Sequence, residues 1–271
     1  MPLPLSPPVF NILASLIEER AGLHYRTDDL ALVRDKISQR AESLGFESLL
    51  DYYYFLRYDP QGSAETDVLV EQLVVHETYF FRESDQLRVC LKRLLAQRYA
   101  SGEIVRIWCA AAATGEEPLT IAMILSDLGL LAQTRILATD VSDKALARAK
   151  SGSFGPRSTR ALPAGIEGRF VHRQGEKTTV DPSLLAAIEW RRLNLLDEAA
   201  VKEAGRFDVI LARNVLIYFA DNTVRRVVTA LTDALVPRGL LLVGASESLL
   251  RYGTQLSCEE HGGAFFYRRT T

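Results

Sequence analysis

The sequence predicts an α/β fold, namely a Rossmann-like doubly wound sheet with an N-terminal helical bundle before it and a small β-subdomain inserted into it. Residues 9–76 show the apolar spacing of amphipathic helices. From residue 104 onward, short β-branched runs alternate with helical segments, which is typical of a parallel sheet. A stretch rich in Gly and Pro, residues 151–192, breaks this alternation. We therefore expect a helical domain over 1–76, a sheet domain over 77–271, and an insertion at about 153–190.

Composition excludes several classes of protein. With 271 residues, of which 48% are hydrophobic and 24% charged, the chain has the make-up of an ordinary globular protein. A net charge of −2 disfavours general nucleic-acid binding. The three cysteines are scattered without metal or disulfide spacing, which predicts no metal site and a reducing cytoplasm. No signal peptide or membrane-spanning run is evident, so we expect no membrane insertion.

The first 76 residues predict four short helices. Gly22 and Gly45 would end the first two, because glycine readily adopts the left-handed conformation after a helix. The third would begin near Ser48 and end before Asp59, and the fourth would cover 68–75. Residues 1–75 hold 12 Asp and Glu against 6 Lys and Arg, so this bundle is acidic.

The central feature of the sequence is residues 104–125, which read as strand, turn and helix. Ile104–Trp108 is β-branched and aromatic, as in a buried parallel strand. The small residues that follow allow a ligand to approach the backbone, and Gly115 can adopt a positive φ. Thr114 is expected to cap the next helix, whose first turn contains Glu116 and Glu117. This is the arrangement of a nucleotide-type crevice at the end of a strand.

Charge indicates which nucleoside would fit that crevice. Glu116 and Glu117 would repel a diphosphate, but they would not repel a cationic or zwitterionic ligand. Asp140 ends the second strand, where an acid can accept hydrogen bonds from ribose hydroxyls. These features favour an adenosine-like cofactor such as S-adenosylmethionine. The alternative is an ordinary βαβ unit whose acids only cap a helix.

The remaining segments complete the predicted sheet. A helix is expected over 142–150, further strands at 189–195, 207–212 and 240–243, a helix over 223–235, and a last antiparallel strand at 264–268 at the end of the sheet. Arg213 and Asn214 follow a central strand and would face the crevice. The result is a seven-stranded sheet of the S-adenosylmethionine-dependent methyltransferase type. The aromatics at 79–81 either contact the ligand or pack into the helix expected over 84–99.

Four motifs carry a resemblance to a known family. They are HETYFFRE at 76–83, WCAAAATGEEPLTIA at 108–122, ATDVSDKALARAKSG at 138–152 and FDVILARNVLIYF at 207–219. On these motifs the chain resembles chemotaxis receptor (glutamate O-) methyltransferases of the CheR family, over about residues 9–268. The resemblance implies methyl transfer from S-adenosylmethionine to glutamates on chemoreceptor cytoplasmic signalling helices, giving glutamyl methyl esters and S-adenosylhomocysteine. It also implies that the inserted subdomain touches the receptor, and we expect the protein to act as a monomer.

The resemblance also implies roles for individual residues. Thr78 and Arg82 would contact the cofactor, with His76 beside them where relatives often have Asn. Glu116 would bind the methionyl amino group, Asp140 the ribose, and Asn194 with Leu195 the adenine. Arg213 and Asn214 would line the end of the pocket. Ala113 and Leu119 replace the more usual Ser and Tyr. Tyr218 either orients the substrate or packs behind Asn214. Each of these residues stands at the stated position of this sequence.

Chemistry of this kind needs few catalytic groups. A glutamate carboxylate is already ionised near neutral pH, so that no general base is required, and orientation can supply most of the rate. The alternatives are a non-catalytic S-adenosylmethionine-sensing signalling module and a methyltransferase for another substrate. The sequence after the central strand, Arg213-Asn214-Val215-Leu216, lacks the prolines typical of enzymes that methylate nucleobase amines.

Overall fold

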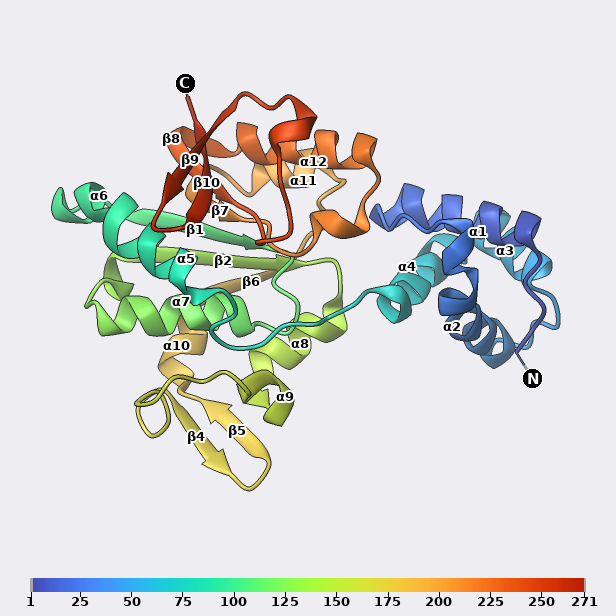
Figure 1. Ribbon diagram of the computed structural model, residues 1–271. Coiled ribbons are helices and arrows are strands. Elements are labelled where there is room, and N and C mark those ends of the chain that lie inside the picture. Colours follow the sequence, from blue (N-terminus) through green and yellow to red (C-terminus); the bar gives the residue numbers. More distant parts are fainter. Residues whose placement is uncertain (1, 271) are drawn as a thin grey trace. The chain divides into compact units, whose positions relative to one another are not determined.

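The structure is a computed structural model that describes residues 2–270. Its chain divides into two compact units. The helical unit comprises Met1–Val75 together with a later segment, Tyr218–Val224. The sheet unit comprises His76–Ile217 and Arg225–Thr271. Figure 1 shows both units in the colours of the sequence, and each is described here by itself.

The helical unit contains the four predicted helices, although the last one begins earlier than predicted. They are α1 (Pro7–Ala21), α2 (Leu30–Ser43), α3 (Leu49–Tyr58) and α4 (Gly62–Leu73). Gly22 ends α1 with a φ of 76°, as expected, and the Ser48 hydroxyl accepts hydrogen bonds from the first backbone N–H groups of α3. The fourth helix begins at Gly62 and not near 68, because its first turn carries polar residues that hide the apolar spacing.

A buried charge cluster joins three helices of this unit. The Arg40 guanidinium donates two hydrogen bonds to Glu65, at 2.7 and 2.5 Å, and the Tyr52 hydroxyl donates a third at 2.7 Å. Glu65 is only 7% exposed. Since an unpaired charge would be costly there, the three side chains hold α2, α3 and α4 together.

A segment from far along the chain completes the helical unit. Leu23 forms an antiparallel bridge with Phe219, and the backbone N–H of His24 donates to the carbonyl of Tyr218 at 2.8 Å. A side chain at position 22 would meet the Phe219 ring at 3.0 Å, so Gly22 allows both the positive φ and the close approach. The segment Tyr218–Val224 therefore belongs structurally with α1.

The sheet unit is built on a seven-stranded sheet with the order β6-β2-β1-β7-β8-β10-β9. Its strands are β1 (Val105–Ala110), β2 (Thr134–Asp140), β6 (Ile188–Arg192), β7 (Phe207–Leu211), β8 (Leu235–Leu242), β9 (Leu256–His261) and β10 (Ala264–Arg269). The first five are parallel, and β10 is antiparallel to β8 and β9. β1 lies between β2 and β7, which makes its carboxyl end the switch point where doubly wound sheets bind ligands.

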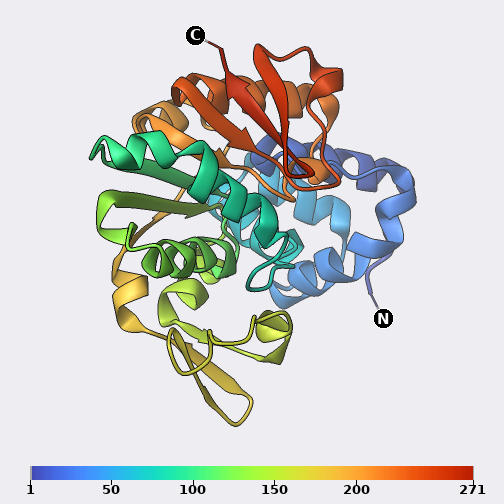
Figure 2. The ribbon, with the colours of Figure 1, turned by 60° about the vertical axis from the view of Figure 1, so that its left-hand side comes forward.

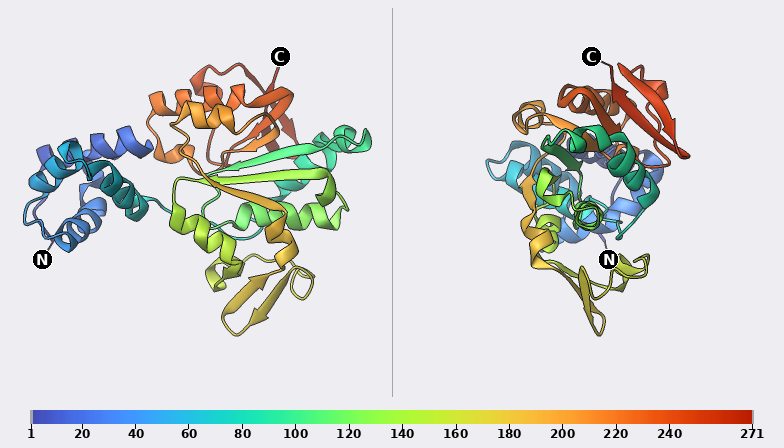
Figure 3. Two further views of the ribbon diagram at one scale, coloured as in Figure 1. Left: turned by 180° about the vertical axis from the view of Figure 1, so that it is seen from behind. Right: turned by 90° about the vertical axis from the view of Figure 1, so that its left-hand side faces the viewer.

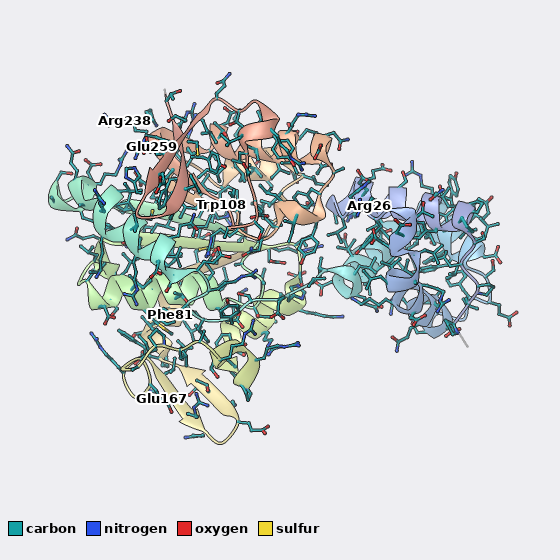
Figure 4. The ribbon with its side chains drawn as sticks, viewed as in Figure 1. Arg26, Phe81, Trp108, Glu167, Arg238 and Glu259 are labelled. Atoms are coloured by element: carbon teal, nitrogen blue, oxygen red, sulfur yellow. The ribbon has the colours of Figure 1, made fainter. Side chains whose placement is uncertain are left out.

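Helices cover both faces of the sheet. On one face lie α5 (Ser84–Val89), α6 (Ala96–Ala100), α7 (Glu116–Asp127) and α8 (Asp143–Ser151), and on the other lie α11 (Glu198–Glu203) and α12 (Asp221–Asp233) (Figures 1 and 3). The core under α5–α7 takes alternate residues of β1, including Val105, Ile107 and Cys109. Trp108 points to the opposite face, where its indole N–H donates to Thr139 at 2.9 Å (Figure 4).

The insertion is a three-stranded sheet with the order β3-β5-β4. Its strands are β3 (Ser153–Phe154), β4 (Val171–Gln174) and β5 (Lys177–Val180), with the short helix α9 (Pro156–Thr159) between β3 and β4. The chain returns through α10 (Pro182–Ala186) to β6. Within the sheet unit, the β4–β5 hairpin projects away from the main sheet (Figures 1 and 2). Its apolar residues, such as Phe154 and Phe170, join the core beneath α7.

Several expected details differ in the structure. The helix expected over 84–99 is broken into α5, a π-helical turn at Cys90–Leu94, and α6. The last strand, β10, is antiparallel as expected, but it lies between β8 and β9 and not at the edge. Gly115, and not Thr114 as expected, occupies the N-cap position of α7. The Thr114 hydroxyl instead donates a hydrogen bond to the Glu116 carboxylate. Across residues 2–270, no helix is both long and apolar enough to span a membrane.

Candidate functional site

The loop after β1 is tightly wound and made of small residues. Ala111 and Ala113 have φ values of 64° and 48°, and Gly115 has a φ of 93°. Positive φ is unfavourable for residues that have a Cβ, so this loop conformation is held by its surroundings. A Cβ on Gly115 would lie 2.7 Å from the Ala149 side chain and 3.0 Å from Trp190. The loop thus packs directly against α8 and β6 and presents its backbone at the switch point.

Asp140 lies at the end of β2 and is fixed by backbone hydrogen bonds. One carboxylate oxygen accepts the N–H of Ala113 at 2.8 Å, and the other accepts the N–H of Ser142 at 2.9 Å. The side chain is buried. Each oxygen of a carboxylate can accept more than one hydrogen bond, so a pair of ribose hydroxyls can bind to the same oriented group.

Glu116 lies in the first turn of α7 and is 1% exposed. Its Oε2 accepts a hydrogen bond from the Thr114 hydroxyl at 2.7 Å. Its Oε1 is buried and has no hydrogen-bond partner among the residues that the structure describes. A buried carboxylate oxygen without a donor is costly unless a ligand supplies one. An ammonium group is the ligand group that best matches it in charge.

Asn194 and Leu195 follow β6 beside Asp140. The backbone N–H of Leu193 donates to the Asp140 carbonyl at 2.9 Å, which places the next two residues at the same edge of the sheet. The Asn194 side-chain oxygen accepts the N–H of Leu196 at 3.0 Å, and Leu195 is buried. This turn therefore presents an apolar side chain and backbone groups, as a flat heteroaromatic ring requires.

Arg213 is held between two glutamates. Its Nη1 donates to Glu117 at 2.5 Å, and its Nη2 donates to Glu83 at 2.7 Å and to the Arg82 carbonyl at 3.2 Å. The Arg213 side chain is 2% exposed. Burial by itself lowers the pKa of Arg213, but Glu117 and Glu83 outweigh this effect and raise it above its ordinary value. Burial raises the pKa of Glu117, and the Arg213 charge opposes that rise.

Asn214 is held by a second glutamate network. It adopts a φ of 58°, in the left-handed region that Asn tolerates better than most residues. Its backbone N–H donates to Glu247 at 2.7 Å, and the same carboxylate accepts the N–H groups of Gly244 at 2.6 Å and Ile217 at 3.2 Å. Glu247 therefore connects the loop after β7 with the loop after β8.

The segment before α5 lies against the first turn of α7. The N–H of Phe81 donates to the Thr120 hydroxyl at 3.0 Å, and that hydroxyl donates to the Glu116 carbonyl at 2.7 Å. Phe80 and Phe81 are buried and belong to the hydrophobic core of the sheet unit. The Arg82 side chain is 27% exposed, and its guanidinium donates to the Glu77 carbonyl at 2.9 Å.

Three of the predicted site residues lack such contacts with the crevice. Thr78 is half-buried, and its side chain makes no hydrogen bond to the residues that the structure describes. His76 has a buried Nε2 without a partner among residues 2–270. Tyr218 belongs to the helical unit. It lies near Tyr25, whose pKa is raised to about 12, chiefly by burial and also by the charges of Asp29 and Tyr218.

Sequence reasoning missed the residues that hold the crevice in shape. Glu83 stands at the end of the HETYFFRE motif but received no role, and Glu247 was not considered. Glu247 follows the end of β8 by five residues. The rule that singled out Asp140 and Asn214, that polar residues after a parallel strand meet at the ligand crevice, could also have found Glu247.

Fold and site together define a class of protein. They form a doubly wound α/β domain whose switch-point crevice contains the fixed Asp140 carboxylate and one buried Glu116 oxygen that has no hydrogen-bond partner among the described residues. This is the arrangement expected of an S-adenosylmethionine-dependent methyltransferase. Comparison with known proteins agrees with this class and narrows it.

The chain belongs to the CheR methyltransferase family. Residues 76–262 match the family described as CheR methyltransferase, SAM binding domain, and residues 8–74 match CheR methyltransferase, all-alpha domain. S-adenosylmethionine is accordingly the cofactor.

Curated relatives match over most of their length. Chemotaxis protein methyltransferase 2 of Vibrio cholerae is 32% identical over 240 residues, covering 86% of this chain and 83% of the relative. Chemotaxis protein methyltransferase of Klebsiella aerogenes is 33% identical, covering 91% and 85%. A probable chemotaxis protein methyltransferase of Rhizobium etli is 32% identical, covering 94% and 97%.

Proposed function

We propose that this methyltransferase esterifies glutamate side chains on the cytoplasmic signalling helices of chemoreceptors, giving glutamyl methyl esters and S-adenosylhomocysteine. The observation that carries the proposal is the buried Glu116 oxygen without a partner, next to the fixed Asp140 carboxylate. Together they match the cationic amine and the ribose of the cofactor. Membership of the CheR family supports receptor glutamates as the acceptors and supports a cytoplasmic site of action.

The site residues would divide the cofactor among them. Glu116 would hold the amino group, Asp140 the ribose hydroxyls, and Asn194 with Leu195 the adenine. Arg82, whose guanidinium is partly exposed, would hold the methionyl carboxylate, with Thr78 and His76 on the same segment. Ala113 replaces a more usual Ser, but its contact with Asp140 uses the backbone N–H and needs no hydroxyl.

Arg213 would act differently from Arg82. Its guanidinium is already engaged by Glu83 and Glu117, so it has little capacity to hold a substrate carboxylate. This favours a role in fixing the crevice. It also suits the chemistry, because a strong ion pair would weaken the nucleophilicity of the substrate carboxylate.

The methyl transfer would depend mainly on orientation. The bound cofactor supplies a methyl group on a positively charged sulfur, which is an activated leaving group. The substrate carboxylate is ionised near neutral pH, so the protein needs to align it and to exclude water. Asn214, which follows β7, would line the methyl end of the crevice.

A methyl-transfer assay tests this function. The protein is incubated with S-adenosylmethionine labelled on the methyl group and with the cytoplasmic signalling fragment of a chemoreceptor from the same organism. We expect label on the receptor that is released as methanol in mild base. Matched receptor fragments with Glu→Gln changes at the labelled positions should lose it. Base-stable label would indicate a methyltransferase for another acceptor group, and cofactor binding without transfer to any receptor fragment would indicate a sensing module.

A further inference from the structure

We propose that Glu247 is a positioning residue that fixes the substrate end of the crevice, acting through a clamp formed by Glu247, Gly244 and Asn214. The inference rests on the proposed function, in which Asn214 lines the methyl end. No sequence motif discussed above contains Glu247. Its assignment comes from contacts that join two loops at the carboxyl ends of neighbouring strands.

The carboxylate of Glu247 accepts three backbone N–H groups. Oε2 accepts those of Asn214 at 2.7 Å and Gly244 at 2.6 Å, and Oε1 accepts that of Ile217 at 3.2 Å. Backbone donors that point at one carboxylate form charge-assisted hydrogen bonds, which are stronger than neutral ones. The Glu247 side chain thus replaces the regular structure that both loops lack.

Gly244 makes the clamp compact. A Cβ at this position would lie 2.4 Å from the Asn214 amide nitrogen and 2.9 Å from Glu247 Oε2. The Asn214 side chain therefore lies directly on the Gly244 backbone. Glycine is needed here for space, since Glu247 Oε2 is held in place by two backbone N–H groups.

A neighbouring glutamate ties the clamp to the cofactor loop. Glu83 accepts the N–H of Ala245 at 3.2 Å as well as the Arg213 guanidinium at 2.7 Å. Arg213 in turn binds Glu117 in the first turn of α7, next to Glu116. The loops after β7 and β8 are thereby held against α7, the helix that carries Glu116. A shift of about 1 Å at such a position can cost about 100-fold in rate without breaking a direct ligand contact.

Three variants test the clamp in the full chain. In E247Q an amide N–H₂ would face backbone donors, and in G244A a methyl group would displace Asn214. S246A is the control, because Ser246 is exposed in the same loop. We expect E247Q and G244A to lower kcat for receptor methylation by about 10- to 100-fold. The Kd for S-adenosylhomocysteine should stay within about threefold of the wild-type value.

A second measurement does not depend on the acceptor. Amide hydrogen exchange at Asn214, Ile217 and Gly244 should become faster in E247Q, but not in S246A. The proposal would be overturned if amide exchange at these three positions were the same in E247Q as in the wild type. It would also be overturned if the kcat of E247Q equalled that of the wild type. Equal losses of cofactor affinity and rate with a lower Tm would overturn it too, since Glu247 would then serve stability alone. If the wild type forms no methyl ester on any receptor fragment, the proposed function fails, and the exchange data still decide whether the clamp exists.

Discussion

Arg213 and Glu117, which are 96 residues apart in the sequence, are joined by a 2.5 Å ion pair in the interior of the sheet unit. The loop after β7 and the first turn of α7 depend on this contact for their spacing. Glu83 binds the other side of the same guanidinium. Arg82 lies 3.9 Å from Glu83, so the two acids face two bases, of which Arg213 is the buried one.

Removal of Arg213 should destabilise the sheet unit. R213M would remove the buried counter-charge that Glu117 and Glu83 share, and we expect a loss of about 3–5 kcal/mol in the free energy of unfolding. R213K should recover only part of it, because an ammonium cannot reach both acids in a fork. Urea unfolding followed by circular dichroism measures both. The control is R226M. Because Arg226 and its partner Glu198 are both exposed, this variant should lower the free energy of unfolding by less than about 1 kcal/mol. Equal losses in R213M and R226M would contradict the role of the buried pair.

The stability of the helical unit should depend on the charge of Glu65. Burial raises the pKa of Glu65, but hydrogen bonds from Arg40 and Tyr52 outweigh this effect and lower it below the ordinary value. The ionised form is therefore favoured by folding. Its contribution is present above the unfolded-state pKa and is lost as the pH falls through the lower folded-state pKa.

E65Q tests this dependence. At neutral pH we expect it to lower the free energy of unfolding by about 2–3 kcal/mol, because charge-assisted hydrogen bonds are lost. The difference from wild type should shrink in acid, as the pH falls below the ordinary pKa of a glutamate. E19Q, which removes the exposed partner of Arg57, is the matched control. A difference that stays constant from neutral to acid pH would refute the assignment.

Asp140 should control cofactor affinity. D140N keeps the shape of the side chain but replaces one acceptor oxygen by a donor, so the Kd for S-adenosylhomocysteine should rise about 10- to 100-fold. Isothermal titration calorimetry gives the value directly. D143N is the control, since Asp143 lies nearby in α8 with a side chain that is 70% exposed. Unchanged affinity in D140N would remove the ribose assignment.

The β4–β5 hairpin should contact the receptor through its basic residues. Arg173 and Lys177 are exposed on neighbouring strands, and Arg173 is 42% exposed even with its partner Glu167. R173E with K177E should lower kcat/KM for receptor methylation about tenfold while leaving cofactor affinity unchanged. K202E on α11 is the control. Arg169 is less suitable for this test, because it pairs with Asp127 and helps to hold the subdomain against α7.

Regular patterns made much of the fold predictable. The β1 loop, the parallel strands and the cap of α8 at Ser142 follow from local rules, since apolar periodicity and capping residues act within a few positions. The order of β9 and β10 was not predictable in this way. Strand β9 alternates intermediate and exposed residues, so it lacks the apolar run that marks the buried strands. The start of α4 was missed for a similar reason.

The site was predictable where one residue acts alone. Asp140 and Glu116 could be placed because each follows a strand or begins a helix. Glu83 and Thr120 could not be assigned roles, because the partners that define them lie 39 to 162 residues away in the chain. For Glu247, the strand-end rule could have indicated its place, but not its partner Asn214, which lies 33 residues away. Such networks depend on tertiary contacts that local patterns do not encode.

The return of Tyr218–Val224 to the helical unit has a consequence for synthesis of the protein. The ribosome releases α1 to α4 long before Phe219, which pairs with Leu23 and covers Gly22. The helical unit of the nascent chain is therefore incomplete, with the end of α1 uncovered, until most of the sheet unit has been synthesised. A fragment ending at residue 75 would remain in that unfinished state, and it should be cut by proteases at the residues following α1 that the intact chain protects.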